Sequence, residues 1–233
     1  MYHFLDGEVL LIDKPLHWTS FDVVNKLKWT IKKNLGIKKI KIGHAGTLDP
    51  LASGLLIVCT GKKTKTIPEI QGQTKVYTGS IELGAVTPSY DLETEVQQIK
   101  DPSFLSMESL HQATEPLTGA YEQAPPIFSA KKINGKRAYD LARAGKQPEL
   151  KKKLIEVEKF ELTHIAMPVV EFEIVCSKGT YIRSIAHDFG QELGVGAYLK
   201  SLRRTQIGTH SVNNALNIET LVSQIEEMAV NKA

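Results

Sequence analysis

The sequence predicts an α+β domain with a mixed, largely antiparallel sheet flanked by helices. Several segments alternate apolar and polar residues, as half-buried strands do, and many of them follow one another as hairpins would. A few stretches with apolar residues at helical spacing lie between them. With 233 residues, the chain is long enough for one large domain. We therefore expect a single domain over residues 1–233.

The first part of the chain predicts two strands and a helix. Residues 7–15 form an apolar strand that ends at a proline. Thr19 and Asp22 have the spacing of a capping box, and apolar residues follow at helical spacing until Gly36, a typical helix stop. The continuous apolar run 55–59 predicts a buried strand.

The remaining elements alternate between strands and helices, around one segment with weak periodicity. Strands are expected at 75–83, 154–165, 169–176 and 201–212. Helices are expected at 106–113, 180–193 and after Asn217, which has the side chain of an N-cap. Residues 121–153 are rich in basic residues, prolines and glycines, so they predict an inserted loop with a helical piece at 138–144.

Composition excludes several classes of protein. No stretch approaches the length of about 20 apolar residues that a membrane span needs, and the N-terminus does not resemble a signal peptide. Cys59 and Cys176 are far apart in the sequence and each lies in an apolar run. They predict two buried thiols in a cytoplasmic protein rather than a zinc site or a disulfide framework.

The charge is unevenly distributed along the chain. Residues 1–65 hold 11 basic and 5 acidic residues, and residues 129–153 hold 9 and 2. Residues 66–128, which lie between them, hold 2 basic and 9 acidic residues. Two basic segments separated by an acidic one fit a surface that binds a polyanion, but they also fit ordinary solvated helix faces and loops. Charge alone leaves both interpretations open.

The loop sequence Gly-His-Ala-Gly-Thr-Leu-Asp-Pro places one histidine, His44, and one carboxylate, Asp49, in front of a buried strand. Asp49 has three possible roles: a turn residue before proline, a metal ligand, or a reacting group. A metal site would need more ligands than this spacing supplies. The local pattern does not choose between a turn residue and a reacting group.

Three other clusters contain residues that often act in sites. Tyr181 and Arg183 flank Ile182, so both would project to one side if a strand continued that far; the arginine would then be placed to pair with a carboxylate. The alternative is an exposed strand end. Tyr77, at the start of a strand, suits either packing or stacking on a base. The pair His187-Asp188 is found in metal sites, but lacks further ligands here.

Taken together, these segments resemble the bacterial tRNA pseudouridine-55 synthases of the TruB family. The resemblance rests on segments that occur in the family's order and span nearly the whole chain: Leu11-Ile12-Asp13-Lys14-Pro15 with Thr19-Ser20, Gly43–Leu56, Lys75-Val76-Tyr77, Pro125–Ala130, Gly179–Arg183 and Leu202-Arg203-Arg204. It implies the pseudouridine synthase fold. It also implies that the T-loop uridine at position 55 of tRNA is isomerised to pseudouridine.

The resemblance also implies roles for individual residues. Asp49 matches the essential aspartate, Tyr77 the tyrosine that packs on the target base, and Arg183 the arginine that pairs with the aspartate. His44 matches a histidine associated with the flipped-out nucleotide, and Tyr181 and Leu202 match residues that line the pocket. We expect the substrate-binding residues to include Lys14 and Arg203, together with Lys131, Lys132 and Lys136 of the basic insertion at 121–153, which would act as a lid that holds the T-arm.

The implied reaction needs neither a redox change nor an energy source, so no cofactor and no metal are expected. A stacked base is inaccessible, so the uridine must be flipped out. Asp49 would attack the sugar, attack the base or remove a sugar proton, and the sequence does not choose among them. The expected partner is the T-arm of tRNA, with no membrane and no protein partner, and nothing requires more than a monomer. Assisting tRNA folding is a second possible role.

Two departures from the family pattern stand out. The family usually continues into a small RNA-binding PUA domain, whereas this sequence ends at Ala233 after its last predicted helix, so we expect the PUA domain to be absent. In the acidic stretch 87–94, threonine occupies position 94, where the family normally has glycine, although Asp91 is kept. The local turn is therefore expected to differ.

Overall fold

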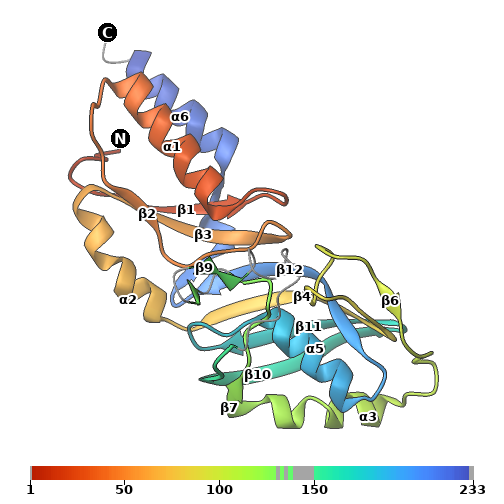
Figure 1. Cartoon of the computed structure of the whole chain (residues 1–233). Coiled ribbons are helices and arrows are strands. Elements are labelled where there is room, and N and C mark those ends of the chain that lie inside the picture. The colour runs from red at the N-terminus through yellow and green to blue at the C-terminus, as the bar shows by residue number, and fades with distance from the viewer. Residues whose placement is uncertain (1, 130–131, 134–135, 139–149, 231–233) are drawn as a thin grey trace. The chain divides into compact units, whose positions relative to one another are not determined.

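The structure, a computed structural model, describes residues 2–129, 132–133, 136–138 and 150–230 (Figure 1). It divides into two compact units. Unit 1 comprises Met1–Tyr77 and Arg203–Ala233, and unit 2 comprises Thr78–Leu202. Two strands, β4 (Lys75–Leu83) and β12 (Ala197–Ile207), contribute residues to both units. The expectation of a single domain stays a prediction.

Unit 1 is built on the buried strand β3 (Ala52–Thr60). The strand pairs antiparallel with β1 (Val9–Lys14) and with β2 (Ile42–His44). The short β14 (Leu216–Asn217) pairs parallel with β1, which makes the sheet mixed, as predicted. Smaller elements complete the unit: β13 (His210–Ser211) and the helical segments η1 (Gly61–Thr66), α2 (Ile67–Gly72) and η3 (Val212–Asn214).

Two helices of unit 1, α1 (Ser20–Leu35) and α6 (Ile218–Val230), lie side by side (Figure 1). The predicted helix signals are confirmed: Thr19 and Asp22 form a capping box, Gly36 ends α1 with a φ of 64°, and the Asn217 side chain accepts a 2.7 Å hydrogen bond from the amide of Thr220. Both helices share a core with β1 and β3, formed by residues such as Ile12, Leu27, Ile31, Leu56, Leu221 and Ile225. Burying each such side chain contributes about 1.5–3 kcal/mol.

Unit 2 contains an antiparallel set of strands. β10 (Lys153–Ala166) pairs with β11 (Val169–Cys176) and with β7 (Gly119–Gln123). The helix α5 (Ile182–Glu192) lies against these strands, and its Phe189 ring contacts that of Phe160 at a centroid distance of 5.5 Å (Figure 1). The other elements are small: α3 (Met107–Gln112), η2 (Glu115–Leu117), β5 (Ala85–Val86), β6 (Gln97–Gln98), β8 (Lys132–Ile133) and β9 (Lys136–Arg137).

The α+β fold class is confirmed, and most predicted elements occur within a few residues of their expected bounds. The strand expected at 201–212 is the main correction, because it begins at Ala197 and is interrupted after Ile207. Gly208, with a φ of +53°, turns the chain there before β13 begins. The helical piece expected at 138–144 lies outside the described residues from position 139 onward, as does Lys131. No helix among the described residues combines the length and hydrophobicity of a membrane span.

Candidate active site

The loop with His44 and Asp49 is the connection of a β-hairpin in unit 1. His44 ends β2 opposite Val58 of β3, and residues 45–51 join the two strands. Asp49 lies near the end of this connection and is partly exposed. Its backbone carbonyl accepts a 3.1 Å hydrogen bond from Ala52 and so closes a turn, as the structural interpretation predicted. The main chain of Asp49 therefore closes the turn. The same turn brings the Asp49 carboxylate to the tip of a buried strand.

Glycine is needed at two positions of this loop. Gly46 and Gly54 have φ values of +107° and +100°, which other residues rarely adopt. A side chain at Gly54 would also lie 2.3 Å from the backbone oxygen of Arg204. The close packing of strand β12 against the hairpin thus depends on Gly54.

Arg204 of strand β12 holds this loop in place. The residue is 1% exposed and donates hydrogen bonds to the carbonyls of Leu55 at 2.8 Å, Gly46 at 3.0 Å and Thr47 at 3.4 Å. In the sequence, Arg204 belongs to the family segment Leu202-Arg203-Arg204, and no role was predicted for it. The sequence shows only an arginine within a strand-like segment. This pattern does not reveal which carbonyl groups the arginine contacts.

Ser20 holds the same loop from the helix side. Its hydroxyl donates to the Leu48 carbonyl at 3.1 Å and accepts from the Leu48 amide at 2.8 Å. Since Ser20 is the first residue of α1, the capping box that begins the helix also fixes this serine. Leu48 precedes Asp49, so the loop that carries Asp49 is anchored on one side by Ser20 and across the loop by Arg204.

Lys14 is buried beside this loop. Its ammonium donates to the carbonyls of Pro15 at 2.9 Å and Trp18 at 2.7 Å. Burial lowers the pKa of Lys14 to about 8, while the negative charge of Asp49 opposes that shift. The geometry indicates that Lys14 fixes the segment before α1 and supplies positive charge near Asp49. Its direct contact with RNA stays a prediction.

His44 is half-buried, and this environment keeps its ring neutral. Burial, and next the positive charge of Arg204, lower the pKa of His44 below its usual range, although the backbone of Gly46 acts in the opposite direction. A neutral imidazole can occupy the space left by a base without carrying its own charge. Tyr77, another predicted site residue of unit 1, is buried at the start of β4.

Arg203 is oriented by an acidic partner. Its guanidinium makes a bidentate contact with Asp13, at 3.0 and 2.7 Å, and a longer one of 3.4 Å with the hydroxyl of Ser53. The pair is partly exposed, so it is accessible to a ligand. Leu202 is half-buried and is the last residue of unit 2. The contact of Arg203 and Leu202 with substrate stays a prediction.

In unit 2, Tyr181 is fixed by its backbone. Gln123 of β7 accepts from the Tyr181 amide at 2.8 Å and donates to the Tyr181 carbonyl at 3.1 Å. Tyr181 is the extended N-cap of α5, and Arg183 already lies in the helix. The strand does not continue far enough for Tyr181 and Arg183 to alternate on it, and Arg183 lies in the helix predicted at 180–193.

Arg183 is almost fully buried at the start of α5. Its Nε lies 3.6 Å from Oδ2 of Asp91, and its Nη1 donates to the carbonyls of Phe128 at 2.9 Å and Ser89 at 3.3 Å. Asp91 was noted only as a kept family residue, so this ion pair was missed. The expected pairing of Arg183 with Asp49 involves the other unit and stays a prediction.

The two remaining expectations concern Thr94 and His187. The hydroxyl of Thr94 accepts a 3.0 Å hydrogen bond from the Ser89 amide and lies 2.8 Å from the Ser89 hydroxyl, so the Thr94 side chain helps to close the turn.

His187 stacks on Tyr90 with ring centroids 3.9 Å apart. Burial raises the pKa of the adjacent Asp188 to about 6. Within the described part of the chain, no three potential metal-ligating side chains come together.

Two family models match the chain. Residues 32–182 match the TruB family pseudouridylate synthase N-terminal domain, and residues 183–232 match the tRNA pseudouridylate synthase B C-terminal domain. Curated proteins named tRNA pseudouridine synthase B are similar over almost their full length. The protein of Flavobacterium johnsoniae is 53% identical and is aligned over 92% of this chain and 94% of its own. The protein of Phocaeicola vulgatus is 47% identical, with 98% and 97% covered.

Solved structures of other proteins have a fold similar to that of this chain. A Cbf5-Nop10-Gar1 complex contains a chain with a TM-score of 0.71 and 28% identity, over 97% of this chain and 60% of that one. An H/ACA RNP bound to a substrate RNA containing 2'-deoxyuridine gives a TM-score of 0.70 and 26% identity, over 99% and 57%. The present chain thus spans about 60% of the length of these structural relatives.

Proposed function

Because the chain belongs to the TruB family of pseudouridylate synthases, we propose that it is an isomerase that converts uridine 55 in the T-loop of tRNA into pseudouridine. The observation that carries this proposal is the position of Asp49. It lies on a hairpin connection that Arg204 and Ser20 hold at the tip of a buried strand. A carboxylate that must act at one bond of a bound nucleotide needs such a fixed position.

The reaction breaks the bond from N1 to C1′, rotates the detached uracil and joins C5 to C1′, after which C5 loses its proton. No atom is gained or lost overall, so the reaction is an isomerisation. Asp49 is the group that attacks the sugar or the base, or that removes a sugar proton. The Lys14 ammonium is close enough to Asp49 for the two charges to interact.

The other site residues bind and orient the nucleotide in this proposal. Tyr77 stacks on the uracil, and Arg183 pairs with the carboxylate of Asp49. His44 fills the space that the flipped base leaves, and its lowered pKa keeps it uncharged there. Tyr181 and Leu202 line the pocket.

In this proposal, basic residues bind the tRNA. Lys131, Lys132 and Lys136 belong to the insertion 121–153, which we propose binds the phosphates of the T-arm and closes over the site. Lys14 and Arg203 complete the predicted set of RNA-binding residues.

We propose that the enzyme acts as a monomer. Since its proposed substrate is tRNA, we also propose that it acts in the cytoplasm.

Tritium release tests the proposal directly. The protein is incubated with T-loop RNA that carries tritium at C5 of its uridine, since forming the new bond at C5 expels that atom to water. We expect release by the wild type and none by Asp49→Asn, which keeps the shape of the side chain. An inactive wild type, or full release by the variant, contradicts the proposal.

A further inference from the structure

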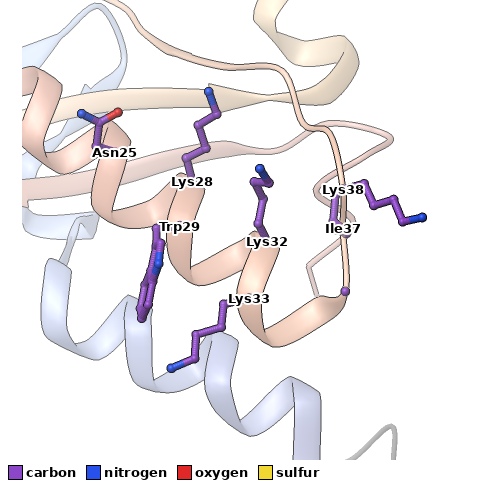
Figure 2. A pocket seen from close by; sticks show the side chains of 8 residues that line it. Asn25, Lys28, Trp29, Lys32, Lys33, Ile37 and Lys38 are labelled. Carbon is purple, nitrogen blue, oxygen red and sulfur yellow. The ribbon is translucent and has the colours of Figure 1, made fainter.

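The exposed face of α1 forms a surface outside the catalytic hairpin that the reaction does not use. A groove of about 580 Å³ is lined by Asn25, Lys28, Trp29, Lys32, Lys33, Gly36, Ile37 and Lys38. We call it the lysine groove. Figure 2 shows Lys28 and Lys32 extending from the same side of the helix, whereas Trp29 and Lys33 extend from the other. The opposite face of α1, with Val23, Leu27 and Ile31, is buried in the core, so the face that carries the lysine groove is open to another contact.

The charge of this region is of a single sign. Seven lysines and no acidic residue occur between Val23 and Leu48. Lys32 and Lys33 suit the negative end of the helix dipole, which explains two of these lysines but not Lys28 or Lys38. Clustered positive charge is costly through repulsion unless a polyanion balances it. The lysine groove is therefore complementary to a chain of phosphates.

Trp29 adds a feature that phosphate binding alone does not need. Its side chain is 53% exposed, and the ammonium of Lys33 lies 4.7 Å from the ring centroid. An exposed aromatic ring beside cations is the arrangement on which unpaired nucleobases stack. A membrane-binding helix would instead present its main apolar face outward, whereas Val23, Leu27 and Ile31 of α1 are buried in the core. The combination favours RNA as the ligand.

The lysine groove is also close to the catalytic hairpin along the chain. Lys38 and His44 are six positions apart in the sequence, so their Cα atoms lie at most about 22 Å apart. One turn of a nucleic-acid duplex spans about 34 Å, so a single RNA arm can reach both.

We propose that the lysine groove is a second contact surface for tRNA, in which Lys28, Lys32 and Lys38 bind phosphates and Trp29 stacks on an unpaired base. The inference rests on the proposed function, because that function makes tRNA the substrate. The surface increases the affinity for tRNA and takes no part in the chemical step.

The salt dependence of binding tests the phosphate contacts. The triple variant Lys28→Ala, Lys32→Ala, Lys38→Ala removes three charges, and the dissociation constant for tRNA is measured at several KCl concentrations. Three lost phosphate contacts reduce the slope of log affinity against log salt by about 2 to 3. The matched control is Lys62→Ala, Lys159→Ala, Lys200→Ala. It removes the same charge from lysines that are paired with Asp6, Glu173 and Glu82 at 3.3, 3.0 and 2.7 Å. We expect the control to keep the wild-type slope.

Trp29→Ala tests the stacking contact. Loss of one stacked base weakens tRNA binding about 5- to 150-fold. The control is Phe104→Ala, because Phe104 is also exposed, at 60%, and has the ammonium of Lys100 at 4.7 Å, but lies in an acidic part of the chain. We expect Trp29→Ala to raise KM with kcat unchanged at saturating tRNA, and Phe104→Ala to change neither.

The outcomes separate this inference from the proposed function. If the wild type modifies tRNA but the lysine-groove variants match their controls in salt slope and KM, the inference is wrong and the function stands. If the wild type makes no pseudouridine yet the lysine-groove variants lose tRNA affinity, the function is wrong and the surface stands. Weaker binding of the variants to vesicles that contain phosphatidylserine, with unchanged tRNA affinity, also overturns the inference.

Discussion

Replacing Arg204 with methionine tests whether the loop of Asp49 must be held in place. Arg204 donates to the carbonyls of Leu55 and Gly46 at 2.8 and 3.0 Å, and more weakly to that of Thr47 at 3.4 Å. A hydrogen bond to a charged group contributes about 1.5–3 kcal/mol, so the two short bonds together account for about 3–6 kcal/mol. Methionine fills much of the volume but leaves these carbonyls without a donor. We expect the free energy of unfolding to fall by about that amount.

The effect on activity follows from the position of the loop. A displacement of about 1 Å at a reacting group costs about 100-fold in rate, so the single-turnover rate of tritium release should fall by that order under conditions where Arg204→Met is folded. Urea denaturation measures the stability. Arg204→Lys is the matched control, because it keeps the charge but not the planar set of donors, and should be intermediate. If Arg204→Met is destabilised yet reacts at the wild-type rate, Arg204 does not position Asp49.

Three further predictions concern stability, each measured by urea denaturation. Thr19→Ala removes the cap of α1 and should lower the free energy of unfolding by about 1 kcal/mol. An unchanged free energy of unfolding would show that the capping box is not needed. Asp91→Asn removes the negative charge from the buried ion pair with Arg183 and should lower the free energy of unfolding by about 3 kcal/mol, and an unchanged midpoint would contradict this. The pKa of Lys14 is lowered to about 8 from 10.5, so losing its proton favours the folded state, and stability should rise by roughly 2 kcal/mol between about pH 8 and 10. Lys14→Met should lose this rise; a rise that persists in the variant would assign it to another group.

Local sequence signals predicted the elements of the fold well. The Thr19 cap and the Gly36 stop are encoded within a few residues of the helix ends that they define, and both are confirmed. Alternating polarity likewise predicted β11 with its observed bounds, because one face of that strand is buried. The interruption near Gly208 was missed, since a turn inside an apparently continuous strand pattern depends on backbone conformation.

The contacts within the site were much less predictable. Arg204 and Gln123 act on carbonyl and amide groups of segments that are distant in sequence, and main-chain groups carry no sequence signal. Arg183 lies in the helix that the sequence predicts at 180–193, and the conditional alternation with Tyr181 on a strand was left open because a short polar segment fits both periods. The identity of Asp49 as a candidate reacting group came from the family resemblance rather than from the loop alone.

Mapping pseudouridine in tRNA that has been treated with the protein tests the central claim most directly. Unmodified tRNA is incubated with the wild type or with Asp49→Asn, and every pseudouridine is located along the sequence. We expect the wild type to produce pseudouridine at position 55 and Asp49→Asn to produce none. Unmodified uridine at position 55 after treatment with the wild type, or pseudouridine there after treatment with the variant, would contradict the account.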